Sequence, residues 1–170
     1  MGYMTKYDCS SGDIGPIETL NKKEVFGIIR YMYEQKGWNV LNEILTAAPT
    51  AELQPVTNDG KIQTDEEDMG LTYHELAYFA LFRCERCSGP FSMFDALMEV
   101  FPELDLDQLQ WKVERFFNRY TRNRHKIPVG TPSIHLRNYS SDGKIRDVRP
   151  FFYTSLKWQY DKIEEKKQKV

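Results

Sequence analysis

Apolar residues recur at helical spacing from Val25 to Met32, and helix signals bound this stretch on both sides. Asn21 is a favourable N-cap residue, and Glu24 stands three positions later, as in a capping box. The apolar residues between them and Gly37 fall on one helical face, and Gly37 is suited to a helix stop. The pattern therefore predicts a helix from residue 21 to about residue 36.

The same periodicity, with its caps and stops, predicts further helices along the chain. Thr72 and Glu75 form a second capping box, and Ser88-Gly89-Pro90 is a stop signal. Asp105 opens the longest apolar pattern, which runs to about Arg122. The helices predicted after the first span residues 40–47, 72–87, 92–101, 105–122 and, as a frayed charged tail, 158–169.

The intervening stretches are rich in Gly, Pro, Ser and Asp, which is typical of loops. Residues 48–71 form the longest polar connection, and a connection of that length is usually functional or mobile. Residues 128–150 are predicted as loop with short extended pieces, and a short strand is predicted over 3–7. The chain is therefore predicted to be mainly α, without a sheet, internal repeat or second domain of its own. This arrangement is typical of part of a larger domain.

Composition narrows the possible classes of protein. The 170 residues are 41% hydrophobic and 14% aromatic, with a formal net charge of -2. These values indicate a globular protein and argue against non-specific nucleic-acid binding. No apolar run approaches the roughly 20 residues that span a bilayer, and no signal peptide is evident. A membrane partner is therefore not expected.

Three cysteines are present, an odd and low number for this length. A disulfide framework is therefore not expected, which favours a reducing compartment such as the cytoplasm. Cys84 and Cys87 form a Cys-x-x-Cys pair, but no second pair or histidine stands at metal-ligand spacing. They are predicted to be two semi-buried thiols on a helix, with no metal site.

Charged and polar residues near the first predicted helix are candidates for contacts with a nucleotide. Lys6 can pair with a phosphate, and Asp13 can accept a hydrogen bond from a ribose hydroxyl or an amide. Lys22 falls in the first helical turn, where free N–H groups already favour anions. Thr50 can offer its hydroxyl and backbone amide to a phosphate. Taken singly, each is better explained as an ordinary surface residue.

Two further charged groups flank later helices. Asp65, Glu66, Glu67 and Asp68 form an acidic run that can hold a divalent cation or complement the N-terminus of the next helix. His125-Lys126 follows the basic end of the longest predicted helix. This pair can clamp a phosphate or carboxylate, or stabilise the helix C-terminus.

Taken in order, five segments carry a resemblance to a known family. They are Thr5-Lys6-Tyr7 with Asp13-Ile14 and Pro16, then Lys22, Pro49-Thr50-Ala51-Glu52-Leu53, the QTDEEDMGLTY sequence of residues 63–73, and His125-Lys126. Residues 131–151 resemble an extension of the eukaryotic branch. The chain thus resembles the C-terminal part of the synthetase domain of eukaryote-type, glutamine-dependent NAD synthetases.

The resemblance implies a fold and an activity. Residues 1–170 would be the C-terminal portion of an α/β, adenine-nucleotide α-hydrolase-like (Rossmann-like) synthetase domain. The implied enzyme is a ligase that amidates deamido-NAD to NAD through an acyl-adenylate, using Mg-ATP and ammonia from glutamine. The implied partners are these substrates and, in a homo-oligomer, further copies of the enzyme.

Site residues carry over position by position. Lys6, Asp13, His125 and Lys126 would bind deamido-NAD, Lys22 and Thr50 would bind ATP, and Asp65 and Asp68 would lie on a lid loop without a firm role. Cys9 stands where simpler bacterial members often have aspartate, so the role of that aspartate does not transfer.

The resemblance also implies parts that the chain lacks. The family's SGGxDS pyrophosphate loop, its magnesium-binding glutamate and its glutaminase domain would lie upstream. We therefore expect no catalytic residue in this chain, magnesium ligands mostly outside it, and no turnover by the chain alone. One alternative is a non-catalytic helical module that stabilises a partner subunit. Another is a nucleic-acid binder using the basic face of residues 115–126, against which the net charge argues.

Overall fold

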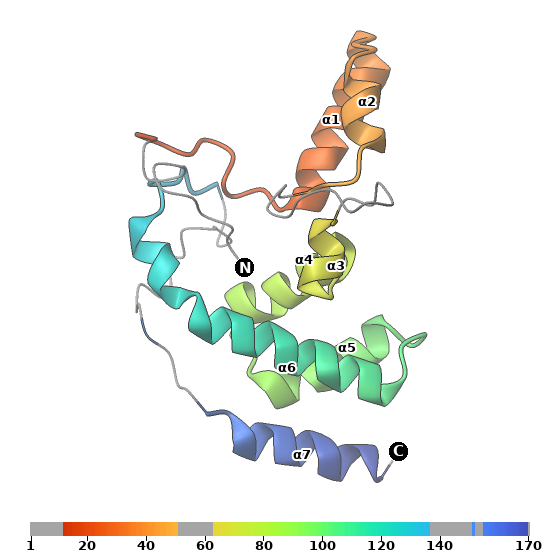
Figure 1. Ribbon diagram of the computed structural model, residues 1–170, viewed down its shortest axis with the longest axis vertical. Helices are drawn as coiled ribbons and strands as arrows, with labels where there is room; N and C mark the ends of the chain where they lie inside the picture. The colour runs from red at the N-terminus through yellow and green to blue at the C-terminus, as the bar shows by residue number, and fades with distance from the viewer. Residues whose placement is uncertain (1–11, 51–62, 137–150, 152–154, 170) are drawn as a thin grey trace. The chain divides into compact units, whose positions relative to one another are not determined.

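The computed structural model describes residues 12–50, 63–136, 151 and 155–169 (Figure 1). The chain divides into two compact units. One is Leu20–Ala77, and the other combines Met1–Thr19 with Tyr78–Val170. The regular secondary structure of the described residues is helical apart from one parallel bridge between Gly15 and Ser133, which confirms the mainly α prediction there. The strand predicted over 3–7 lies outside the described residues.

The first unit opens with two short antiparallel helices, α1 (Lys22–Lys36) and α2 (Leu41–Thr46), hereafter the α1–α2 hairpin. The predicted capping box is present. Asn21 Oδ1 accepts from the Glu24 amide at 3.0 Å, and the Asn21 amide donates to Glu24 Oε2 at 2.8 Å. Gly37 ends α1 with a φ of 65°, a left-handed conformation that glycine adopts without strain. The prediction for this helix is confirmed.

The long polar connection contains a helix that the pattern did not predict. Residues Asp65–Met69 form α3, so the prediction of an unstructured stretch over 48–71 is wrong there. The cause is a third capping box. Glu67 N donates to Thr64 Oγ1 at 3.3 Å, and Thr64 N donates to Glu67 Oε2 at 3.2 Å. Four acidic residues in this first turn also complement the helix dipole.

Helix α4 (Tyr73–Ala80) follows at once and carries the predicted Thr72–Glu75 capping box. It continues into a π-helical turn, η2 (Leu81–Glu85), so the predicted helix over 72–87 changes its winding before it ends. Cys84 lies half-buried in this turn. Cys87 has a φ of 55° and is exposed beyond the turn, so the prediction of two semi-buried helical thiols is wrong for Cys87.

The second unit contains three helices that lie side by side, α5 (Pro90–Val100), α6 (Leu106–Arg122) and α7 (Lys157–Lys167). We call them the three-helix bundle. Pro90 is the first residue of α5 rather than part of the preceding stop, because proline's fixed φ and missing N–H suit a first helical turn. The predicted starts of α6 at Asp105 and of α7 near residue 158 are confirmed within one or two residues. The bundle's buried apolar residues are Met93, Phe94, Leu97, Leu109, Val113, Phe117 and Ile163.

Polar contacts also join α7 to the other two helices. Gly89 has no side chain to cap α5, and Gln159 Oε1 accepts from the Phe91 amide at 3.2 Å instead. A Cβ at Gly89 would lie 2.6 Å from that oxygen, so glycine permits this approach. The half-buried Lys167 donates to Gln110 Oε1 at 2.7 Å and pairs with Asp107. These contacts fix the position of α7 along the bundle.

No described helix is long and apolar enough to cross a bilayer.

Candidate functional site

Tyr73, the first residue of α4, holds the corner between α3 and α4. Its hydroxyl donates to Asp65 Oδ2 at 2.7 Å, and its amide donates to Glu66 Oε1 at 2.6 Å. The acidic run therefore folds back onto the start of the next helix. We call Lys22, Phe26, Asp65, Glu66 and Tyr73 the Tyr73 cluster. All five lie within one unit.

Lys22 lies over two aromatic rings of this cluster. Its Nζ is 5.7 Å from the centroid of Tyr73 and 5.6 Å from that of Phe26. Both distances are within the range of a cation–π attraction. Lys22 is exposed, and within the described part of the chain no carboxylate lies within 4.0 Å of its Nζ. Its charge is thus oriented by rings rather than neutralised, which suits a lysine that receives an anion.

The segment that carries Thr50 is tied to the same corner. The Asp65 amide donates to the Pro49 carbonyl at 3.0 Å, so Thr50 follows directly on a residue bonded to the start of α3. Thr50 itself is half-buried. The structure therefore places the predicted residues Lys22, Thr50 and Asp65 in one unit and links two of these three segments by a backbone bond.

Asp65 has one satisfied and one open carboxylate oxygen. Oδ2 accepts from Tyr73, whereas Oδ1 is buried and has no hydrogen-bond donor among the described residues. A buried acceptor without a donor is costly. Asp68 lies on α3 and is half-buried. Both residues predicted on a lid loop are thus on a short helix, so the loop part of that prediction is wrong. Within the described ranges no group of three or more metal-ligating side chains converges.

Asp13 lies in the second unit, in a loop anchored to the stretch that follows the 3₁₀ helix η3 (Arg124–Val129). The Gly15 amide donates to the Pro132 carbonyl at 2.8 Å, and the Ile134 amide donates to the Gly15 carbonyl at 3.1 Å. Ser133 Oγ also donates to Glu18 Oε2 at 2.8 Å. Asp13 itself is exposed. Its backbone is therefore held close to these bonds while its carboxylate faces solvent.

His125 and Lys126 are the second and third residues of η3, a short helix that directly follows α6. His125 Nδ1 lies 2.9 Å from the Arg122 carbonyl. Because a carbonyl only accepts, Nδ1 must carry the hydrogen of this bond. The exposed ring therefore presents Nε2 to a ligand, as an acceptor when neutral and as a donor when protonated. Lys126 is half-buried.

Sequence reasoning missed an arginine pair beside these residues. Arg124 is buried, and its Nη1 donates to the Tyr120 hydroxyl at 2.8 Å. The guanidinium groups of Arg124 and Arg83 each lie 5.1 Å from the Tyr120 ring. This contact fixes the end of α6 from which His125 and Lys126 extend. A buried arginine next to His125-Lys126 had no sequence signal beyond general basicity. Tyr73 did have one, because it closes the QTDEEDMGLTY segment.

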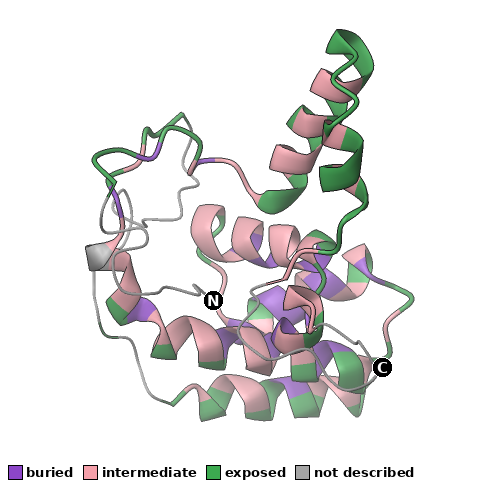
Figure 2. Cartoon of the chain, turned by 45° about the horizontal axis from the view of Figure 1, so that its top comes forward, coloured by how far each residue is buried: buried purple, intermediate pink, exposed green. Residues whose placement is uncertain are grey.

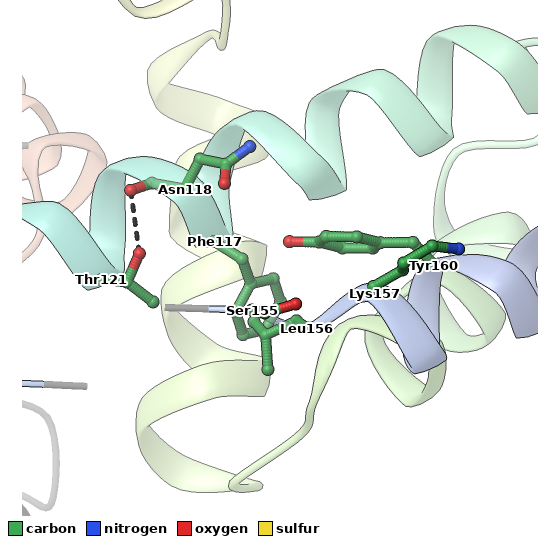
Figure 3. Close-up of a pocket in the computed structure, with 7 residues that line it drawn as sticks. All are labelled: Phe117, Asn118, Thr121, Ser155, Leu156, Lys157 and Tyr160. Atoms are coloured by element: carbon green, nitrogen blue, oxygen red, sulfur yellow. Dashed lines mark hydrogen bonds between the residues drawn. The ribbon is translucent and has the colours of Figure 1, made fainter. Parts of the chain in front are cut away.

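A small cavity of about 130 Å³ lies elsewhere, between α6 and the start of α7 (Figure 3). Phe117 and Leu156 give it apolar walls, and Asn118 and Tyr160 add polar groups. Burial, with the nearby charge of Glu114, raises the pKa of Tyr160 to about 12. None of the predicted site residues lines this cavity.

The predicted residues thus fall into two groups. Lys22, Thr50, Asp65 and Asp68 belong to one unit, whereas Asp13, His125 and Lys126 belong to the other. In the first group, Lys22 and Asp65 contact the Tyr73 ring. In the second group, Asp13 lies on an anchored loop, and His125 and Lys126 lie in η3. Lys6 lies outside the described residues.

Comparison with known proteins defines the class. The family model for NAD synthase matches residues 1–129, which is most of the chain. The chain therefore belongs to the NAD synthase family, and the resemblance inferred from the five ordered segments is confirmed.

Particular relatives extend the match beyond residue 129. The glutamine-dependent NAD(+) synthetase of Saccharomyces cerevisiae is 46% identical across 96% of the chain. The proteins of the same name from Drosophila melanogaster and Homo sapiens are each 42% identical, across 99% and 96% of it. The chain spans 23%, 22% and 24% of these three relatives respectively, so it corresponds to about a quarter of their length.

Proposed function

We propose that this chain forms the C-terminal portion of a synthetase domain that amidates deamido-NAD to NAD. The observation that carries the proposal is the identity of 42–46% over nearly all of the chain to proteins named glutamine-dependent NAD(+) synthetase. The exposed, ring-supported Lys22 adds physical support, since no carboxylate of the described residues lies within 4.0 Å of its Nζ. The rest of the machinery, a pyrophosphate-binding loop and a glutaminase domain, would belong to the longer protein.

The proposed domain is of the α/β, adenine-nucleotide α-hydrolase-like and Rossmann-like class, and this chain supplies helices of it. We place the enzyme in the cytoplasm as a homo-oligomer, with no nucleic-acid or membrane partner. The low cysteine number supports a reducing compartment.

The proposed reaction has two steps. An oxygen of the nicotinate carboxylate attacks the α-phosphorus of ATP, and the bond to the β-phosphate oxygen breaks to release pyrophosphate. Ammonia from glutamine then attacks the acyl carbon, loses a proton, and expels AMP to give the amide of NAD. The adenylate is needed because a free carboxylate is a poor electrophile. Fixed cations and N–H donors lower the barrier by stabilising the charge that develops on the phosphates.

In this proposal each of the two groups of residues binds a different substrate. Lys22 and Thr50 bind ATP, with the Lys22 ammonium on its phosphates. Asp13, His125 and Lys126, with Lys6, bind deamido-NAD. Asp65 and Asp68, which lie on α3, would cover the ATP side without a firm role of their own. Magnesium would accompany the ATP phosphates, held by ligands mostly outside this chain.

The test is steady-state kinetics in the longer protein that carries the remaining parts. Lys22→Ala is expected to lower kcat/KM for ATP by more than about tenfold, equivalent to roughly 1.4 kcal/mol. The matched control is Lys36→Ala, which removes an exposed lysine from the last turn of the same helix and is expected to leave kcat/KM within about twofold.

The second arm concerns deamido-NAD. His125→Ala is expected to raise the KM for deamido-NAD and to leave the KM for ATP unchanged. If neither Lys22→Ala nor His125→Ala alters any kinetic constant, the alternative of a non-catalytic helical module is correct instead.

A further inference from the structure

The Tyr73 ring is the feature of the cluster that the proposed roles do not yet use. Two interactions from different helices converge on it: Lys22 of α1 lies over its face, and Asp65 of α3 accepts from its hydroxyl. We infer that Tyr73 is a positioning residue of the ATP side, whose ring orients the Lys22 ammonium toward an incoming phosphate. The inference rests on the proposed function.

A lysine loses side-chain conformational freedom when it binds a phosphate. Its side chain is long and flexible, and confining it to one arrangement opposes binding. A ring beneath the ammonium restricts that freedom in advance without removing the charge, whereas a carboxylate partner would compete with the phosphate. Lys22 has two such rings, Tyr73 and Phe26, and Phe26 lies one turn along the same helix.

Hydrogen bonds hold the Tyr73 ring in place. Its hydroxyl is fixed by Asp65 Oδ2 at 2.7 Å, and its amide is fixed by Glu66 Oε1 at 2.6 Å. Asp65 is itself fixed through its amide to the Pro49 carbonyl. Tyr73 is therefore hydrogen-bonded both at its backbone amide and at its hydroxyl, so the face of its ring cannot easily turn away from Lys22.

These contacts separate two contributions of Tyr73. The ring face acts on Lys22, and the hydroxyl acts on the ring through Asp65. Tyr73→Leu removes both contributions, whereas Tyr73→Phe keeps the ring and removes only the bond to Asp65.

In the longer protein, Tyr73→Leu is expected to raise the KM for ATP about three- to fivefold. Tyr73→Phe is expected to restore it to within about twofold of wild type. The KM for deamido-NAD is expected to stay constant, which general damage to the fold would not allow.

A double-mutant cycle with Lys22→Ala gives the decisive measurement. If Tyr73 acts through Lys22, Tyr73→Leu changes the KM for ATP by less than about 1.5-fold once Lys22 is alanine. An equal effect of Tyr73→Leu in both backgrounds would overturn the inference, because the ring would then act independently of the lysine. The matched control is Tyr31→Leu, which removes an exposed tyrosine of α1 and is expected to change nothing.

The failure of this inference differs from the failure of the proposed function. If Lys22→Ala leaves the KM for ATP unchanged, the proposed role of Lys22 fails. If Lys22→Ala raises the KM and Tyr73→Leu does not, the role of Lys22 stands and the positioning role of Tyr73 is wrong.

Discussion

The α1–α2 hairpin and the three-helix bundle begin from the same kind of sequence pattern and end with opposite environments. Neither helix of the hairpin contains a buried residue, and Ile28, Trp38 and Val40 are about half or more exposed. In the bundle, Phe94 and Leu109 are fully buried. Figure 2 shows the contrast, with buried residues throughout the bundle and none in the hairpin.

The difference shows that periodicity predicts a helix but not the surface against which it packs. The apolar stripe of α1 is weaker than that of α6, and its capping box and its Gly37 stop are the features that define it locally. The bundle is instead stabilised mainly by the burial of apolar side chains. The two regions should therefore respond differently to the loss of an apolar side chain and to the loss of a cap.

Truncation of a core side chain should have the largest effect on the free energy of unfolding. Phe94→Ala should lower the free energy of unfolding by about 3–5 kcal/mol, because it removes a fully buried ring and leaves a cavity. Ile28→Ala, in the exposed stripe of α1, should cost less than about 1 kcal/mol. Urea unfolding of both variants followed by circular dichroism measures the contrast. A similar loss from both would mean that the hairpin stripe is covered in solution.

Most helices could be predicted from the chain because their signals are local. The Asn21, Thr72 and Asp105 caps lie within three residues of the groups they bind. The missed helix, α3, had the same signal in Thr64 and Glu67, but the surrounding polar residues concealed it. The π-turn at residues 81–85 has no comparable local signal.

The candidate site was predictable only in part, because its contacts join distant segments. Lys22 was identified from its place in the chain, but one of the two rings beneath it comes from a residue 51 positions later. The buried Arg124 was missed because polarity predicts exposure, and its environment depends on Tyr120 and on packing. Order along the sequence identified the family, whereas spatial pairing required the fold.

An intermediate effect is expected at the caps. Asn21→Ala removes the acceptor for the Glu24 amide and should cost about 1 kcal/mol. Asp105→Ala removes an acceptor for two amides of α6 and should cost a similar amount. The location of the damage should differ, because buried side chains hold α6 and none holds α1. Hydrogen exchange should show faster exchange throughout α1 in the first variant, but only in the first turn of α6 in the second. Uniform loss along both helices would contradict the contrast.

The smallest expected effect is a loss of stability at high pH that arises in the three-helix bundle. The pKa of Tyr160 is raised to about 12, first by burial and second by Glu114, so the folded state favours the neutral phenol. The unfolded chain ionises near pH 10. The stability linked to this group is therefore complete below about pH 10 and is lost as pH rises toward 12. Because Tyr160 is only half-buried, solvent screening reduces the loss to about 0.5–1 kcal/mol at pH 11.

Urea unfolding of wild type and Tyr160→Phe at pH 9 and pH 11 isolates this contribution from the other groups that ionise. Phenylalanine cannot ionise, so the variant should lose less stability between the two pH values than wild type does. Tyr31→Phe, in the exposed part of α1, is the matched control and should retain the wild-type loss. If Tyr160→Phe and wild type lose the same amount, the phenol of Tyr160 reaches solvent in the folded state. The junction of α6 and α7 is then looser than the buried residues of the bundle indicate.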